Sequence, residues 1–211
     1  MPRSTHCRAA TLLLALLLSP LLMAYEQPAY TVEQALADDA EIRRYEPMLL
    51  AEVVVEGDRS TAVSRAFRAL AGYIFGDNTP QAKIAMTSPV MQTTEVKGEK
   101  IAMTTPVGQT ALEDGQWRVS FMMPAKYTLA TLPAPNNDAV RFQVTDPYRA
   151  VVLRFSGRHT DRNFEEHLAE LDGLVAQEQL EVVGNPTLAY YDPPFKPFFW
   201  RRNEVMYRLV D

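Results

Sequence analysis

The chain has 211 residues, of which 47% are hydrophobic, and it carries 21 basic against 26 acidic residues, a formal net charge of −5 at pH 7. This length suits one domain of ordinary size with a full hydrophobic core. An acidic chain gains little from counterion release at phosphates, so the composition argues against nucleic acid as a partner.

Residues 1–24 have the layout of a secretory signal peptide. Arg3 and Arg8 give the segment a positive start, and an apolar run follows at 9–22, with a small residue for cleavage at the end. The run is short for a membrane span, and an uncleaved anchor is the alternative. We therefore expect an exported protein, periplasmic or secreted, whose mature chain forms a single domain over residues 25–211.

The mature chain contains no cysteine, because Cys7 lies in the predicted signal peptide. It can form no disulfide, and it has no thiolate for zinc, an iron–sulfur cluster or covalent heme attachment. Loss of Arg3 and Arg8 leaves 19 basic against 26 acidic residues, a net charge of −7. Small molecules or proteins remain as partners.

The first regular patterns predict a strand followed by a helix. An apolar block at 48–55 indicates a strand, and apolar residues recur every third or fourth position at 59–75, which indicates an amphipathic helix. Asp58 or Ser60 can cap this helix, and Gly76 can end it. Its apolar stripe consists of Val63, Ala66, Phe67, Leu70, Tyr73 and Ile74.

An eight-residue segment then occurs twice, at 83–90 and 100–107, with seven identical positions and a spacing of 17. Two copies this short cannot stack into a solenoid. We interpret them as two short strands, each ended by its proline, in a hairpin that closes at Lys97-Gly98 and places Glu95 opposite Lys100.

Further strands and a second helix complete the pattern. Period-two or short apolar stretches predict strands at 117–123, 142–144, 151–155 and 205–209. A helix is predicted at 161–179, capped by Thr160 or Asp161, with a stripe of Phe164, Leu168, Leu171, Leu174 and Val175. Each half of the chain thus places one helix among antiparallel strands, which favours an α+β domain with a curved sheet or open barrel and a groove beside the helices.

Four ordered segments resemble the SOUL heme-binding family. They are EIRRY (41–45), GDN (76–78) followed by KIAMTSPV (83–90), VSFMMP (119–124) with YTL (127–129), and YDPP (191–194) with RRNEV (201–205). The resemblance implies a distorted antiparallel barrel or curved sheet of about eight strands with two helices, in two pseudo-symmetric halves. It also implies similarity to the effector-binding domains of bacterial drug-sensing regulators, and non-covalent binding of heme or another porphyrin.

The resemblance further implies where such a ligand lies. Heme is a flat apolar plate with two carboxylates, so its site needs an apolar slot and a cation near the mouth. The outer face of the first helix would form one wall of the slot, and the segment around Lys196 would close the other, with cations facing a propionate. The residues expected at the ligand are Phe67, Leu70, Ala71, Tyr73, Phe195, Lys196 and Arg201. The alternative for Phe67 and Leu70 is a place in the core.

Residues 190–202 gather aromatic rings, cations and prolines. Aromatic rings beside cations suit a flat anionic ligand, and they equally suit peripheral contact with a membrane surface. The alternative is a loop shaped by prolines that lays its rings on the sheet.

The mature chain offers only His159 and His167 as nitrogen ligands for iron. His167 lies within the apolar stripe of the second helix and is our candidate metal ligand, with a hydrogen-bonded packing role as the alternative. Some family members carry a histidine just before the tyrosine of the EIRRY segment, and others a lysine beside the tyrosine that ends the first helix. Here these positions are Arg44 and Gly72. Both departures favour binding by apolar contact.

The sequence contains no motif that predicts catalysis: no thiol in the mature chain, no Gly-x-Ser-x-Gly, no His-Glu-x-x-His and no glycine-rich phosphate loop. We therefore expect a non-enzymatic binding or carrier protein for heme or a related tetrapyrrole. The alternatives are a binding module for another amphiphile, such as a lipid or a lipophilic cation, and an enzyme that modifies tetrapyrroles.

Overall fold

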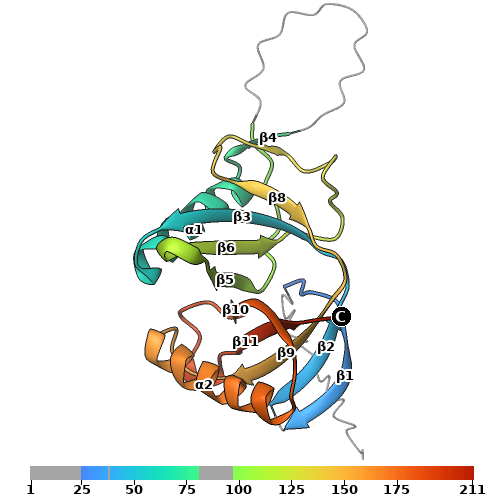
Figure 1. Cartoon of the computed structure of the whole chain (residues 1–211). Coiled ribbons are helices and arrows are strands. Elements are labelled where there is room, and N and C mark those ends of the chain that lie inside the picture. Colours follow the sequence, from blue (N-terminus) through green and yellow to red (C-terminus); the bar gives the residue numbers. More distant parts are fainter. Residues whose placement is uncertain (1–24, 38, 81–96) are drawn as a thin grey trace, which may run out of the picture.

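The structure, a computed structural model, describes residues 25–37, 39–80 and 97–211 (Figure 1). It contains a nine-stranded sheet, a two-stranded sheet and two α-helices. Within these ranges no helix combines the length and apolar character that a membrane crossing requires.

The large sheet is antiparallel throughout and has the order β1-β2-β9-β11-β10-β5-β6-β3-β8. Its strands are β1 (Tyr30–Ala37), β2 (Ala40–Tyr45), β3 (Leu49–Glu56), β5 (Val107–Ala111), β6 (Gln116–Met122), β8 (Arg141–Val144), β9 (Tyr148–Phe155), β10 (Val182–Tyr190) and β11 (Asn203–Leu209). The short strands β4 (Asn78–Thr79) and β7 (Ala134–Pro135) form the second sheet. Because β1 and β8 do not pair, the large sheet is open and curved, not a closed barrel.

The two halves of the sheet each carry one helix, as expected (Figure 1). Helix α1 (Arg59–Ile74) packs on β3 and β6, whereas α2 (Asp161–Gln177) packs on β9, β11 and β10. The halves are joined by the pairing of β5 with β10. This arrangement confirms the α+β class and the division into two similar halves.

Both helices begin at residues whose side chains satisfy a free backbone N–H group. The Asp58 carboxylate accepts a hydrogen bond from the Thr61 N–H at 3.0 Å, and the Thr160 hydroxyl accepts one from the Asn163 N–H at 3.3 Å. Gly76 follows the end of α1 with φ of +115°, a conformation that glycine adopts without strain. The predicted helices are therefore confirmed to within one or two residues at each end.

Both helices cover the same face of the sheet. Gln109 of β5 pairs with Val119 of β6 on one side and with Leu188 of β10 on the other. Val119 belongs to the core beneath α1, and Leu188 belongs to the core beneath α2. Since directly paired residues of antiparallel strands point to the same side, the two helices lie side by side on one face with Gln109 between their cores.

The duplicated segment does not form the expected hairpin where it can be seen. The first copy and Glu95 lie outside the described residues. In the second copy the strand β5 begins only at Val107, after the proline. The preceding Ile101 is buried in the α1 core, and its N–H donates to the Ile74 carbonyl at 2.8 Å, so this stretch is bound to the end of the helix. A Cβ on Gly98 would lie 1.7 Å from the Gly76 carbonyl oxygen, so this close approach requires glycine.

The first and the last of the four family segments meet in a buried network of charges on the helix-free face. Glu204 of β11 is fully buried and accepts two hydrogen bonds from Arg43 of β2, at 2.9 and 3.1 Å. Arg202 donates to the same carboxylate at 2.7 Å, and so does the Tyr191 hydroxyl at 2.7 Å. Burial alone would raise the pKa of Glu204, but the hydrogen bonds and charge of Arg43, with Arg202, hold it below its usual value. These motif residues therefore link β2 to β11 across β9, which lies between them in the sheet.

Candidate functional site

A groove of about 560 Å³ lies on the helix-covered face, where the two halves meet. One wall is α1, the floor is the start of β5, and the far wall is formed by the turn before α2 and the end of β10. Its volume is in the range usual for small-molecule sites. We call it the α1 groove. Its lining includes Tyr25, Arg59, Val63, Phe67, Met103, Val107, Gln109, His159, Asp161, Tyr190, Tyr191 and Asp192.

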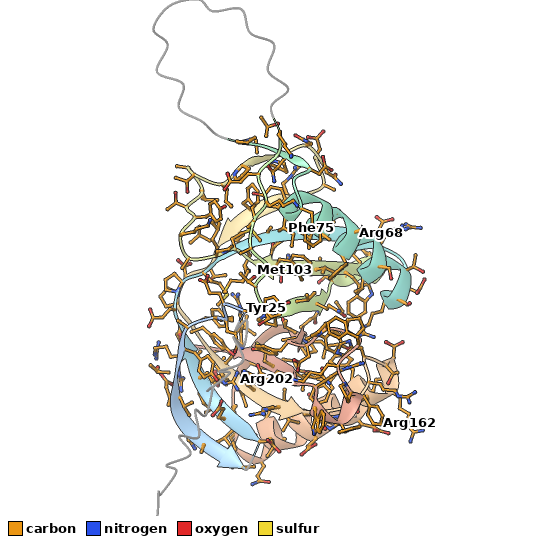
Figure 2. The ribbon with its side chains drawn as sticks, turned by 180° about the vertical axis from the view of Figure 1, so that it is seen from behind. Tyr25, Arg68, Phe75, Met103, Arg162 and Arg202 are labelled. Carbon is orange, nitrogen blue, oxygen red and sulfur yellow. The ribbon has the colours of Figure 1, made fainter. Side chains whose placement is uncertain are left out.

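Phe67 supplies the largest apolar surface on the α1 side of the groove. Its side chain is 39% exposed, and its ring packs edge-on against Phe121 with centroids 5.4 Å apart. Ala66 and Leu70 of the same helix are fully buried against the sheet, so Phe67 falls on the flank of the helix. Tyr25 and Met103 also line the groove, and Figure 2 shows Tyr25 near the junction of the two halves.

Unpaired polar atoms concentrate in this groove. Among the described residues, five buried side-chain nitrogen or oxygen atoms have no hydrogen-bond partner, and three of them belong to lining residues: Arg59 Nε, Gln109 Oε1 and His159 Nε2. Buried polar groups are nearly always hydrogen-bonded, because burial removes their bonds to water. Three such atoms beside an apolar wall therefore indicate a place for a ligand that carries polar groups.

Arg59 also ties the two halves together across the groove. From the first turn of α1, its guanidinium forms an ion pair with Asp161 at the start of α2. A second nitrogen donates to the Tyr190 hydroxyl at 2.7 Å. Arg59 thus brings a positive charge to the junction of the halves.

His159 brings a neutral imidazole to the far wall. Its ring stacks on Tyr190 with centroids 3.8 Å apart. Burial, together with the nearby charges of Arg201 and Arg59, lowers the pKa of His159 from 6.5 to about 4. The ring is therefore uncharged at neutral pH.

This lowered pKa predicts a pH-dependent stability. Between about pH 6.5 and 4 the unfolded chain binds a proton at His159 that the folded chain does not, so the free energy of unfolding should fall as the pH falls through this window. Replacing His159 with phenylalanine keeps a ring against Tyr190 and should reduce this decline. Urea unfolding at several pH values measures the free energy of unfolding of both proteins. If the free energy of unfolding falls with pH equally in His159→Phe and in the parent, the lowered pKa of His159 is contradicted.

Most of the residues expected at a ligand lie elsewhere. Leu70 and Tyr73 are 0% and 1% exposed and belong to the core beneath α1, and neither lines the α1 groove. Their stripe faces the sheet, as the alternative for Leu70 proposed. Ala71 is half-buried outside the groove. Only Phe67 of that set lines it.

The second expected wall is displaced from the groove. Phe195 is 87% exposed, and Lys196 forms an ion pair with Asp192 at 2.7 Å. Arg201 donates hydrogen bonds to the backbone carbonyls of Lys196 and Pro194, so its guanidinium binds within its own loop. These residues follow directly on Tyr191–Pro194, which does line the groove.

His167 lies outside the groove. Its ring stacks on Phe155 with centroids 4.1 Å apart, and its Nδ1 is 2.7 Å from the Asn163 carbonyl oxygen. In the described parts of the chain no group of three or more His, Cys, Asp or Glu side chains could hold a metal ion. The contacts of His167 are those of a packing residue, and the histidine that the fold brings to the groove is His159.

A second hollow, of about 690 Å³, lies on the helix-free face. Charged side chains of Glu52, Arg118 and Arg208 line it, and Arg118 Nε lies 3.7 Å from a Glu52 oxygen. It contains one unpaired buried atom, Arg118 Nε, against three in the α1 groove. The groove is therefore the stronger candidate site despite its smaller volume.

Sequence reasoning missed Arg59 and Gln109 as groove residues. A signal for Arg59 was present, because Arg59, Val63 and Phe67 recur every four residues and so lie along one line of α1. Gln109 had no such signal, since its position depends on the pairing of β5 with β10.

Comparison with known proteins places the chain among relatives of similar length. A family model described as "SOUL heme-binding protein" matches residues 25–208. Heme-binding protein 1 of Xenopus tropicalis is 26% identical over 168 residues, which cover 79% of this chain and 82% of that protein.

Solved structures show the same architecture at low sequence identity. The C-terminal domain of EcmrR aligns with a TM-score of 0.58 at 10% identity, covering 86% of this chain and 98% of that one. A hydrolase from Listeria innocua aligns with a TM-score of 0.52 at 12% identity, covering 90% and 94% of the two chains. At these identities the likeness shows the fold alone.

Proposed function

Because the chain belongs to the SOUL heme-binding protein family, we propose that it binds heme or a related tetrapyrrole non-covalently in the α1 groove. The observation that carries the choice of groove is the gathering of three unpaired buried polar atoms beside an apolar wall. We further propose a binding or carrier role without catalysis, and export to the periplasm or medium.

The groove residues fit the chemistry of heme. Val63, Phe67 and Met103 offer apolar and thioether surface to a flat ring system. Arg59 offers a cation toward a carboxylate, and His159 offers a neutral imidazole. Bound heme would contribute an iron atom able to take an axial ligand. The absence of cysteine from residues 25–211 excludes attachment of heme through thioether bonds.

A lipophilic cation is the second candidate ligand. Asp161 and Asp192 both line the groove and bring negative charge to it. Asp161 is paired with Arg59, and Asp192 is paired with Lys196. An anionic ligand would bind the basic member of such a pair, whereas a cationic ligand would bind the acidic member. A lipid would use the same apolar wall.

Titration of hemin into the purified mature protein tests the proposal. We expect a saturable sharpening and shift of the Soret band at micromolar protein. A saturable response to an aromatic lipophilic cation, with no response to hemin, would favour the second candidate. No saturable change with either ligand would contradict a binding site of this kind.

Export is tested separately from binding. The proposal expects the protein in the periplasmic or extracellular fraction of its host, with a mature N-terminus near residue 25. A membrane-bound protein with an intact N-terminus would instead support the anchor.

A further inference from the structure

Four large aromatic side chains project into solvent from one short loop. In the aromatic loop, defined as Phe195–Trp200, the exposed fractions are 87% for Phe195, 43% for Phe198, 56% for Phe199 and 68% for Trp200. Single exposed apolar residues are ordinary on protein surfaces, but a contiguous group of this size marks an interaction site.

Hydrogen bonds hold the aromatic loop in this conformation. The Gly157 N–H donates to the Phe198 carbonyl at 3.0 Å, and Phe198–Trp200 form a turn of 3₁₀ helix. Arg201 Nε donates to the Lys196 carbonyl at 2.8 Å, and another nitrogen of Arg201 donates to the Pro194 carbonyl. Because Arg201 bonds the loop from within, exposure of the rings is a property of an ordered segment.

Three of the four rings form one cluster, with cations beside it. Phe199 meets Phe198 and Trp200 edge-on, with centroids 5.4 and 5.0 Å apart. The Arg158 guanidinium lies 5.0 Å from the centroid of the Phe198 ring. Lys196, within the loop, is also partly exposed.

The composition of the cluster, more than its area, favours a membrane as the partner. At about 200 Å² for each aromatic side chain, the exposed fractions correspond to roughly 500 Å² of apolar surface. The apolar part of a standard protein interface, roughly 57% of about 800 Å² per partner, is of the same size, so area alone does not choose the partner. A membrane interface requires no complementary surface, and it favours tryptophan and other rings flanked by lysine and arginine.

We propose that the aromatic loop inserts its rings into the interface of a lipid bilayer and docks the protein there. The preceding residues, Tyr191–Pro194, line the α1 groove, so docking would bring the groove to the membrane surface. An amphiphilic ligand dissolved in the bilayer could then reach the groove without crossing water. Docking itself does not depend on the ligand, and only this second consequence rests on the proposed function.

Vesicle binding by the mature protein tests the proposal. We expect the protein to sediment with vesicles of phosphatidylcholine and phosphatidylglycerol. In a Trp117→Phe background, which leaves Trp200 as the single tryptophan of the mature chain, the emission should shift to the blue on binding. The triple variant Phe195→Ser, Phe199→Ser, Trp200→Ser should bind at least tenfold more weakly.

The matched control replaces exposed apolar residues elsewhere. Phe75 and Val183 are 59% and 52% exposed, and the double variant Phe75→Ser, Val183→Ser should bind vesicles like the parent. Urea unfolding of all variants checks that each is folded.

A parent that stays in the supernatant would overturn membrane docking, as would equal vesicle binding by parent and triple variant. A parent dimer that the triple variant converts to a monomer, without vesicle binding, would reassign the loop to self-association. The triple variant should still bind hemin in solution, so loss of docking and failure of the heme proposal are separate results.

Discussion

Replacing Glu204 with alanine is expected to lower the free energy of unfolding by roughly 3–5 kcal/mol, because it removes the buried carboxylate that pairs with Arg43 and Arg202 and leaves Arg43 only its ion pair with the partly exposed Glu41. Arg43 is 2% exposed, and each of its two terminal nitrogens donates a hydrogen bond to the Glu204 carboxylate. The variant also removes the acceptor for Arg202 and for the Tyr191 hydroxyl. Urea denaturation of the parent and Glu204→Ala proteins measures the difference.

An exposed ion pair provides the control for this prediction. Glu166 pairs with Arg162 on the surface of α2, where the two side chains are 56% and 88% exposed. Water and salt screen such pairs, so Glu166→Ala should unfold at nearly the same urea concentration as the parent. Equal losses in the two variants would show that the buried network has no special role.

The same network predicts loss of stability in acid. The pKa of Glu204 lies below its ordinary value of 4.5 in the folded protein, so its ionised form stabilises the fold above about pH 4.5. This contribution should be lost as the pH falls through the lowered pKa. This decline begins near the lower end of the His159 window, so comparison with the His159→Phe variant along one pH series separates the two contributions.

Replacing Phe67 with alanine is expected to weaken hemin binding about tenfold, equivalent to about 1.4 kcal/mol, because the α1 groove loses its largest apolar wall. Phe75→Ala is a closely matched control, since Phe75 follows directly on α1, is 59% exposed and lies outside the groove lining (Figure 2). Soret titrations of both variants measure the effect. Because this prediction depends on the proposed ligand, it is meaningful once the parent has been shown to bind.

A groove-filling variant tests the same site without removing a core contact. Ser64 is exposed on α1 and lines the groove, so Ser64→Trp should place an indole where the ligand lies and weaken hemin binding at least tenfold. Its unfolding midpoint should remain close to that of the parent. Normal affinity in both Phe67→Ala and Ser64→Trp would move the ligand away from the α1 groove, with the charged hollow on the helix-free face as the next place to test.

Two long strands of the nine-stranded sheet, β1 and β10, escaped prediction for physical reasons that can be named. Residues of β1 are mostly exposed because the strand lies at the sheet edge, so no alternation of apolar and polar residues develops there. In β10 the register shifts between Val183 and Thr187, around Gly184 and Pro186, which interrupts the period of two. The strand predicted over the second copy of the duplicated segment does not form, for a different reason. The residues before Val107 pack against the end of α1, and the strand begins only at Val107.

The sequence by itself determined the two helices, their caps, most of the strands and the family, because these depend on local periodicity and on ordered motifs. It could not separate core from groove on α1. The same helical period contains Phe67, which lines the groove, and Leu70, which is buried, and only the packed sheet decides between them.

Tertiary structure also decided what the groove contains. Pairing of β5 with β10 joins the two halves of the sheet and brings Arg59, Gln109 and His159 to one place from three distant parts of the chain. The segment around Lys196, expected to form a wall of the groove, lies in an exposed loop beside it. Long-range strand pairing has no local signature in the sequence, so the residues it brings together could be identified only from the folded chain.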